Sequence, residues 1–165
     1  MIIPARKLRY GFTLIELLIV IAIIGILAAA VLIAVNPAKR QNQANDANIK
    51  SDIGSIATAA QAYYTQPGAG SYPVDLNTLV TNQDLKQLPD PKDNGTATTW
   101  IYAVQDQTAG APACAPNTGD ICIEAYMYYP LFDPIAAGNV WCWESIEGKA
   151  EEESVANCID FLAAT

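Results

Sequence analysis

An apolar stretch near the N-terminus constrains this chain more than any other feature. Residues 12–35 contain a single charged side chain, Glu16. Because a helix rises about 1.5 Å per residue, this stretch is long enough to cross a hydrocarbon core of about 30 Å. Three basic residues precede it, Arg6, Lys7 and Arg9. Basic residues beside a membrane span stay in the cytoplasm, so the rest of the chain is expected on the other side of the membrane.

Two ordinary uses of such a stretch leave Glu16 unexplained. A secretory signal has a shorter apolar region, about 7–15 residues, and then small residues at a cleavage site, which Ala28-Ala29-Ala30 would provide. A plain single-span anchor is the second alternative. A carboxylate at the centre of a membrane helix costs about 2.5–3.5 kcal/mol, and such residues usually have a partner. No Lys or Arg follows Glu16 until Lys39.

A cut just before the apolar stretch would supply the missing cation. If the chain were cut between Gly11 and Phe12, a new α-amino group would appear four residues before Glu16. That group would lie at the same depth as the carboxylate in a neighbouring helix that is shifted along its axis.

The segment Arg9-Tyr10-Gly11-Phe12-Thr13-Leu14-Ile15-Glu16-Leu17-Leu18 resembles the cleavage and methylation motif of type IV prepilins and type II secretion pseudopilins. The resemblance implies that a membrane aspartic prepilin peptidase cuts after Gly11 and methylates the amine of Phe12. It also implies that Glu16 pairs with the Phe12 amine of a neighbouring subunit and selects the register of assembly. Three segments follow from it: a leader (1–11), a transmembrane and assembly helix (12–35), and an exported domain (36–165).

The apolar helix has two predicted weak points. Pro37 lacks an N–H and clashes with the carbonyl four residues back, yet it suits the first turn of a new helix. Gly25 costs about 1 kcal/mol relative to Ala inside a helix. Pilins commonly loosen here when packed in filaments, so the segment from Gly25 to Pro37 is predicted to do so. A fixed bend between the membrane and exported parts is the alternative.

The helical pattern resumes after Pro37, so the exported domain is expected to begin with an amphipathic helix over about residues 37–66. Its apolar side chains recur at spacings of four, three, four and three residues and form one stripe: Ile49, Ile53, Ile56, Ala60 and Tyr63. The stripe lasts only about two heptads, which favours packing on the domain over a coiled coil. Gln66-Pro67-Gly68 is expected to stop the helix.

Three segments rich in aromatic and β-branched residues predict strands: 98–105, 121–129 and 140–146. An antiparallel sheet of three or four strands laid over the apolar stripe would bury both surfaces. The expected class is therefore α+β, a long N-terminal helix packed on a small antiparallel sheet, which is the type IV pilin fold. Acidic side chains favour a helix N-terminus, so residues 151–153 are predicted to begin a terminal helix. That helix would carry Val155, Ile159 and Leu162.

Four cysteines lie in the last third of the chain: Cys114, Cys122, Cys142 and Cys158. An even number in a small exported domain favours two disulfides, with three possible connectivities. Pairing of sequence neighbours would join Cys142 to Cys158 and Cys114 to Cys122, and pairing between these two sets is the alternative. The spacing does not match a zinc site and the chain has no His, so no metal site is predicted.

The remaining sequence favours a structural role over catalysis. Without His, a Ser–Lys pair, a Gly-x-Ser-x-Gly elbow or a Gly-rich phosphate loop, the usual catalytic groups are missing, so neither an enzyme nor a cofactor is expected. Removing residues 1–11 leaves six basic and 17 acidic side chains, and such a surface repels nucleic acid. Asp90, Asp93 and Asn94 lack calcium-loop spacing and are expected to be turn residues.

The function implied is that of a pilin, a structural subunit of a type IV pilus-like filament. The alternative is a pseudopilin of a type II secretion or competence system, and a third class is a membrane-anchored binding domain that never polymerises. The expected partners are copies of the same chain, the prepilin peptidase, the membrane assembly platform and, before assembly, the cytoplasmic membrane. The expected location is a single-pass membrane protein with its C-terminal domain outside the cytoplasm, and then an extracellular or periplasmic filament.

Overall fold

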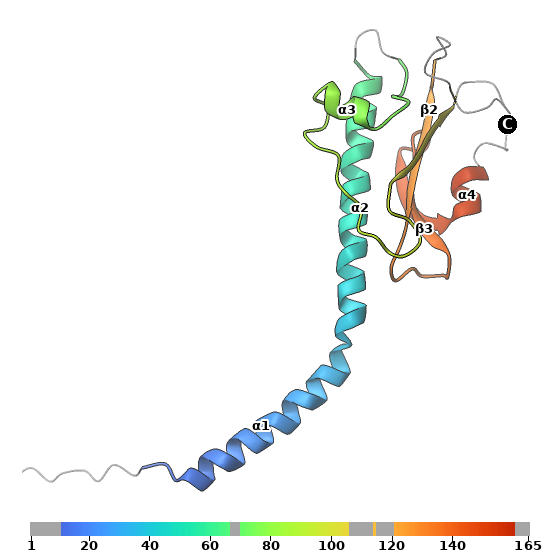
Figure 1. The fold of residues 1–165 in the computed structure, drawn as a ribbon. Helices are drawn as coiled ribbons and strands as arrows, with labels where there is room; N and C mark the ends of the chain where they lie inside the picture. The colour runs from blue at the N-terminus through green and yellow to red at the C-terminus, as the bar shows by residue number, and fades with distance from the viewer. Residues whose placement is uncertain (1–10, 67–69, 106–113, 115–120, 161–165) are drawn as a thin grey trace, which may run out of the picture. The chain divides into compact units, whose positions relative to one another are not determined.

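The chain divides into two units of different composition, residues 1–40 and residues 41–165. The structure, a computed structural model, describes residues 11–66, 70–105, 114 and 121–160. Within these residues the helices are α1 (Leu14–Val35), α2 (Pro37–Tyr64), α3 (Asn77–Thr81) and α4 (Val155–Asp160). The described strands are β1 (Ile101–Gln105), β2 (Glu124–Pro130), β3 (Asn139–Glu144) and β4 (Lys149–Ser154), as Figure 1 shows.

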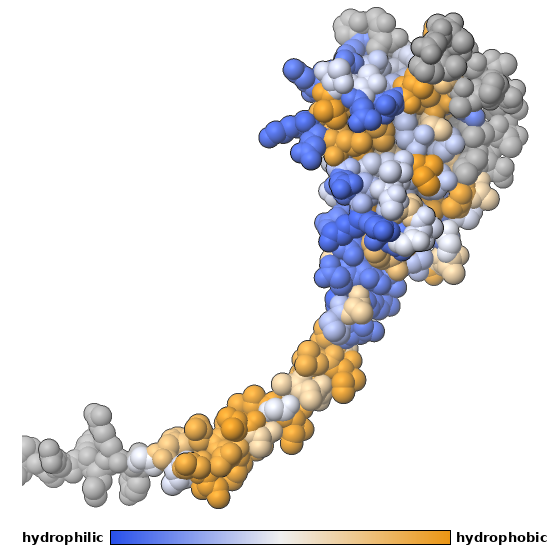
Figure 2. All heavy atoms as spheres, in the orientation of Figure 1, coloured by the Kyte–Doolittle hydropathy of each residue, from blue (hydrophilic) through white to orange (hydrophobic). Residues whose placement is uncertain are grey.

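Helix α1 is apolar on all sides. Every residue of α1 is described, and none of them is buried within the chain. Figure 2 shows mostly hydrophobic side chains over the visible face of the helix. A helix that is hydrophobic all round lies in a large core or in a membrane. Helix α1 is long and apolar enough to cross a membrane, which fits a membrane-anchored precursor.

The two long helices are separated at a single residue. Asn36 adopts a left-handed conformation, with φ 43°, and ends α1. Its side-chain oxygen accepts from the Lys39 N–H at 3.3 Å, and its carbonyl accepts from the Arg40 N–H at 3.3 Å. Pro37 is the first residue of α2, a position where its fixed φ and missing N–H are tolerated. Asn36 therefore ends one helix and caps the next.

Gly25, in contrast, does not break the helix of the single subunit. It lies in the middle of α1, with helical residues on both sides. The cost of one Gly in a helix is about 1 kcal/mol, whereas an unsatisfied backbone group in lipid costs several. The continuous hydrogen-bond ladder is therefore favoured at Gly25 in the single subunit, and loosening of the segment from Gly25 to Pro37 in a filament stays a prediction.

The sheet of the second unit is an antiparallel meander. Within the described residues its strands lie in the order β1-β2-β3-β4, each paired with its sequence neighbour. Met127, at the centre of β2, faces Tyr102 of β1 on one side and Trp143 of β3 on the other. The predicted antiparallel sheet is confirmed, with shorter strands. Strand β1 starts only at Ile101, because the Trp100 indole N–H donates to the Pro89 carbonyl at 2.7 Å and holds the preceding residues against a loop.

The main core lies between α2 and one face of this sheet. The predicted stripe is buried at Ile49, Ile53, Ile56 and Ala60, and Tyr63 is half-buried. These side chains pack against the sheet residues Ala125, Met127, Tyr129 and Trp143. Burying an Ile or Met side chain stabilises a fold by about 1.5–3 kcal/mol. The stripe thus fixes which face of α2 the sheet covers.

A smaller cluster covers the opposite face of the sheet. It contains Tyr128, Val140, Cys142 and Cys158, and Val155 packs against it. The last two of these residues come from α4, which lies across the sheet from α2 in Figure 1. The sheet is therefore covered on both faces, by the long α2 and by the short α4.

The acidic run near the C-terminus is strand, and its predicted role at a helix start is wrong. Glu151, Glu152 and Glu153 lie in β4, opposite Cys142, Trp141 and Val140 of β3. Pairing with β3 outweighs the local preference of acidic residues for a helix N-terminus, and Gly148, with φ 62°, allows the tight turn between the strands. The helix begins later, at Val155. The side chain of Ile159 and all of Leu162 lie outside the described residues.

The burial of the apolar stripe predicts that shortening one of its side chains strongly destabilises the fold. We expect Ile53→Ala to lower the free energy of unfolding of the full chain by about 2–5 kcal/mol, because Ile53 is fully buried and a cavity would remain. Denaturant unfolding in detergent micelles, followed by Trp fluorescence, measures this. Ser51→Ala, at an exposed position of the same helix, is the control and should change it by less than about 0.5 kcal/mol. Equal stability of the two variants would contradict the assignment of the core.

Candidate processing and assembly site

The bond between Gly11 and Phe12 lies just outside α1. Neither residue belongs to a helix or strand, and the Phe12 side chain is 81% exposed. Thr13, the N-cap of α1, is extended, with φ −86° and ψ 152°. The predicted cleavage site thus lies in accessible, non-helical chain. The basic residues of the leader, Arg6, Lys7 and Arg9, lie outside the described residues.

Glu16 and Thr13 form a capping box at the start of α1. The Thr13 N–H and hydroxyl donate to Glu16 Oε2 at 2.8 and 2.7 Å, and the Glu16 N–H donates to Thr13 Oγ1 at 3.3 Å. The carboxylate therefore folds back to the helix N-terminus, where the helix dipole also favours negative charge. Sequence reasoning missed this local partner, although Thr-x-x-Glu before an apolar run is its known signature. Pairing of Glu16 with another subunit stays a prediction.

A second carboxylate that sequence reasoning missed joins α2 to the sheet. Asp46 is only 6% exposed, and its two oxygens accept from the N–H groups of Phe132 at 2.7 Å and Asp133 at 2.9 Å. It lies three residues before Ile49, so it extends the buried stripe. Charge-assisted bonds of this kind are stronger than neutral ones. Asp46 therefore anchors the loop after β2 against the helix, which is a structural role.

The cysteines form two disulfides, as predicted. Cys114 pairs with Cys122 and Cys142 with Cys158, with Cα–Cα distances of 5.9 and 6.0 Å. Of the connectivities left open by the sequence, the structure thus contains the pairing of sequence neighbours. The second disulfide ties α4 to β3, and the first closes a loop whose residues 115–120 lie outside the described ones. Both disulfides brace the C-terminal part of the second unit.

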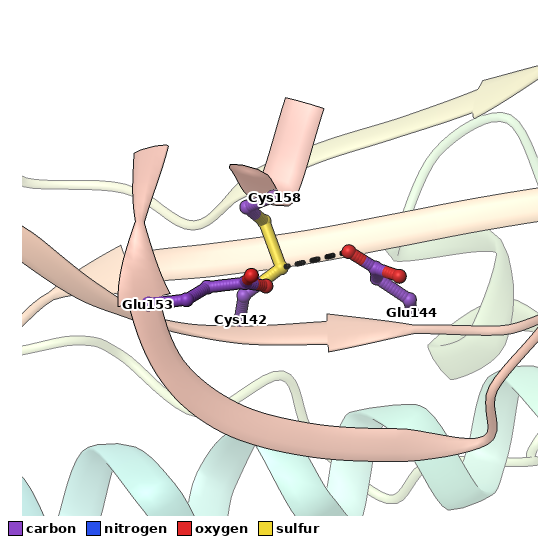
Figure 3. Close-up of side chains that lie close together, drawn as sticks. All are labelled: Cys142, Glu144, Glu153 and Cys158. Carbon is purple, nitrogen blue, oxygen red and sulfur yellow. Dashed lines mark hydrogen bonds between the residues drawn. A yellow bond between two sulfur atoms is a disulfide. The ribbon is translucent and has the colours of Figure 1, made fainter. Parts of the chain in front are cut away.

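The second disulfide lies beside two glutamates, drawn in Figure 3. The sulfurs of Cys142 and Cys158 and one oxygen each of Glu144 and Glu153 lie within 4.8 Å of one another. A closed zinc site needs about four such ligands, and the sulfurs must be thiolates. Here the sulfurs are bonded to each other, so two carboxylates are left. With its disulfide intact, this cluster is not a zinc site.

Crowding in this cluster changes the acidity of its carboxyl groups. Burial raises the pKa of Glu144, and the carboxylates of Glu153, Glu147 and Glu151 raise it further, against a smaller opposite effect of Lys149. Burial likewise raises the pKa of Glu153, and its acidic neighbours add to this. In the folded protein both groups therefore hold a proton more tightly than in the unfolded chain.

The second unit contains a groove of about 490 Å³. It is lined by residues 74–77 and 88–91, by Thr98 and Thr99, and by the rings of Trp100 and Tyr102. The Trp100 N–H and the Tyr102 hydroxyl both donate to backbone carbonyls, at 2.7 Å. Burial also raises the pKa of Tyr102. Neither aromatic residue is therefore poised for acid–base work near neutral pH.

The oxygen-rich segment beside this groove consists of turn residues. Asp93 accepts from the Gly95 N–H at 2.7 Å, and Asn94 accepts from the N–H groups of Thr96 and Ala97 at 2.9 and 3.0 Å. The Asn94 side-chain N–H donates to the Pro130 carbonyl at 2.8 Å. Both side chains thus satisfy backbone groups of the turn, as the sequence indicates.

The raised pKa of Glu144 predicts a pH-dependent stability. A raised folded-state pKa stabilises the fold below the unfolded value, about 4.3, and this contribution is lost as pH rises through the folded pKa. We therefore expect Glu144→Gln to raise the melting temperature at pH 7, with a gain that shrinks as pH falls towards 4. Thermal unfolding from pH 4 to 8 measures this, and Asp90→Asn is the control carboxylate. A gain that grows at acidic pH would contradict the assignment.

Comparison with known proteins agrees with the N-terminal geometry. Residues 6–32 match the family model of the prokaryotic N-terminal methylation motif. No curated protein and no solved structure matches the chain significantly. The motif covers residues 6–11, the Gly11–Phe12 bond, the capping box and most of α1. The long helix followed by an antiparallel sheet fits the pilin fold. The chain thus carries the prepilin-type cleavage and methylation motif in front of an architecture that fits the pilin fold.

Proposed function

We propose that this protein is a pilin, a structural subunit of a type IV pilus-like filament. The observation that carries the proposal is Glu16, which is the one charge of an otherwise apolar, unburied helix and follows an accessible Gly11–Phe12 bond. Prepilin peptidase removes residues 1–11 and methylates the amine of Phe12. Residues 12–35 hold the subunit in the membrane and then in the filament. Residues 36–165 form the exported domain, which ends up in an extracellular or periplasmic filament.

The energetics of Glu16 support assembly through charge pairing. Thr13 supplies two donors to the carboxylate but no positive charge. A carboxylate and an ammonium group 4 Å apart attract each other by about 4 kcal/mol at an effective dielectric of about 20. This is of the same order as the roughly 2.5–3.5 kcal/mol cost of a carboxylate at the centre of a membrane helix. A neighbouring subunit with a free Phe12 amine therefore offsets the cost of keeping Glu16 in an apolar environment.

The exposure of α1 supports the same role. Its large side chains have no partner within the described residues, and many are more than half exposed, including Leu14, Ile26 and Ile33. Exposed apolar surface on this scale marks a membrane or protein interaction site. Lipid covers α1 before assembly, and equivalent helices of other subunits cover it in the filament. The membrane assembly platform moves the subunit from the first environment to the second.

A pseudopilin of a type II secretion or competence system is the second candidate, since it has the same N-terminal cleavage motif and apolar helix. The two disulfides favour the pilin, because they brace a domain that is displayed on the filament surface. Overexpression followed by shearing and electron microscopy separates the two. Long sheared surface filaments support a pilus subunit, and their absence supports a pseudopilin.

The first test is the intact mass and the N-terminal residue of the protein purified from membranes. We expect a product of residues 12–165 that begins with N-methylated Phe12, because cleavage after Gly11 precedes methylation. Mass spectrometry with N-terminal sequencing measures both. A chain that starts near Val31, or an uncut chain, would return the protein to the secreted or anchored class.

The second test removes the charge on which assembly depends. We expect Glu16→Ala to insert into the membrane normally and to form no filaments, because the neighbouring Phe12 amine loses its partner. Membrane fractionation measures insertion, and immunoblotting of the sheared fraction measures assembly. Glu147→Ala, which removes an exposed acidic side chain of the exported domain, is the control and should assemble. Normal filaments from Glu16→Ala would contradict the proposed role.

A further inference from the structure

We propose that Thr13 is a positioning residue for leader removal: by capping α1, it keeps the Gly11–Phe12 bond outside the helix, in a form that a peptidase can bind. This inference rests on the cleavage proposed above. It adds a residue whose side chain does not take part in the chemistry and yet controls the conformation of the bond that is cut.

Hydrolysis requires access to the Gly11 carbonyl. Water adds across the bond, its oxygen to the Gly11 carbonyl carbon and a proton to the Phe12 nitrogen, as the C–N bond breaks. Within a helix, the carbonyl of one residue accepts from the N–H four residues later, and side chains surround the backbone. Extended chain leaves the carbonyl and N–H groups open for main-chain hydrogen bonds to a partner protein. A peptidase therefore needs the helix to start after Phe12.

The capping box sets this start. If α1 were one residue longer, the Glu16 N–H would donate to the Phe12 carbonyl. Instead it donates to Thr13 Oγ1 at 3.3 Å. The first helical hydrogen bond runs from the Leu17 N–H to the Thr13 carbonyl, at 3.3 Å. The Gly11 and Phe12 carbonyls thus lie before the helical ladder and accept no backbone hydrogen bond within the described residues.

The hydrogen bond from the Thr13 N–H to the Glu16 carboxylate also opposes extension of the helix towards the leader. The Thr13 N–H would donate to a carbonyl four residues earlier in a longer helix, but it donates to Glu16 Oε2 at 2.8 Å. The capping box thus satisfies two of the four backbone donors that would extend the helix towards the leader, those of Glu16 and Thr13. These hydrogen bonds matter more near a membrane than in water. In lipid a backbone group without a hydrogen-bond partner is costly, and forming more helix would satisfy it. Loss of the cap is thus expected to move the helix start over the scissile bond.

Thr13 caps α1 through its hydroxyl oxygen and not through its branched shape. Variants that change one of these properties and keep the other therefore test the role. Thr13→Val keeps the branched shape and removes the oxygen that accepts from Glu16. Thr13→Ser keeps the oxygen and is also a preferred N-cap. Thr58→Val makes the same change at an exposed position of α2, where the hydroxyl donates to the Gly54 carbonyl at 2.8 Å, and serves as the control.

The experiment measures leader removal from the full-length precursor in detergent micelles by purified prepilin peptidase. Mass spectrometry gives the initial rates. For Thr13→Val we expect kcat/KM to fall about 3- to 30-fold, the population change that corresponds to losing one N-cap. Thr13→Ser and Thr58→Val should stay within about twofold of the original chain. NMR Cα chemical shifts of residues 11–13 should move towards helical values in Thr13→Val and stay extended in Thr13→Ser.

Every outcome decides the inference. It is overturned if Thr13→Val is cut as fast as the original chain, if Thr13→Ser is as slow as Thr13→Val, or if residues 11–13 of a slow Thr13→Val chain remain extended. In these cases the original chain is still cut after Gly11, so the proposed function survives. If the original chain is not cut there, the proposed function and this inference both fail.

Discussion

The structure depends on the exposure of the apolar helix α1 within the described part of the chain. None of its residues is buried, although it is apolar on all sides. Such a helix must be covered by lipid or by other molecules. In lipid its backbone must also be satisfied internally, which explains why the helix stays continuous through Gly25 and ends only at Asn36. The residues after α1 therefore need a core of their own.

The core of the second unit is built from few packing contacts. One stripe of α2 packs against one sheet face, and a smaller cluster with α4 covers the other. Asp46 and the Cys142–Cys158 disulfide act where apolar packing is thin, at the loop after β2 and at the C-terminal helix. A small domain commonly needs such cross-links. The free energy that it gains by burying apolar surface only slightly exceeds the conformational entropy cost of folding.

The sequence predicts those parts of the fold that follow from local pattern. The spacing of Ile49, Ile53 and Ile56 is enough to identify the buried face of α2. The acidic run of β4 is not predictable in this way, because its strand depends on pairing with β3, which no local pattern records. Asp46 is missed for a similar reason, since its partners are backbone groups 86 and 87 residues away. The Thr13–Glu16 capping box is different, because its Thr-x-x-Glu pattern before an apolar run is visible in the sequence.

The charged strand β4 has a consequence for contacts between copies of the chain. It is the last strand of the sheet, so its outer backbone groups have no strand partner within the described residues. An edge strand of this kind is a template for another strand, and charged side chains make such pairing unfavourable. Here Lys149 and Glu151 form a half-exposed ion pair on that edge, with Glu153 beyond them. At high local protein concentration, this edge thus disfavours amyloid-like strand addition between copies of the chain.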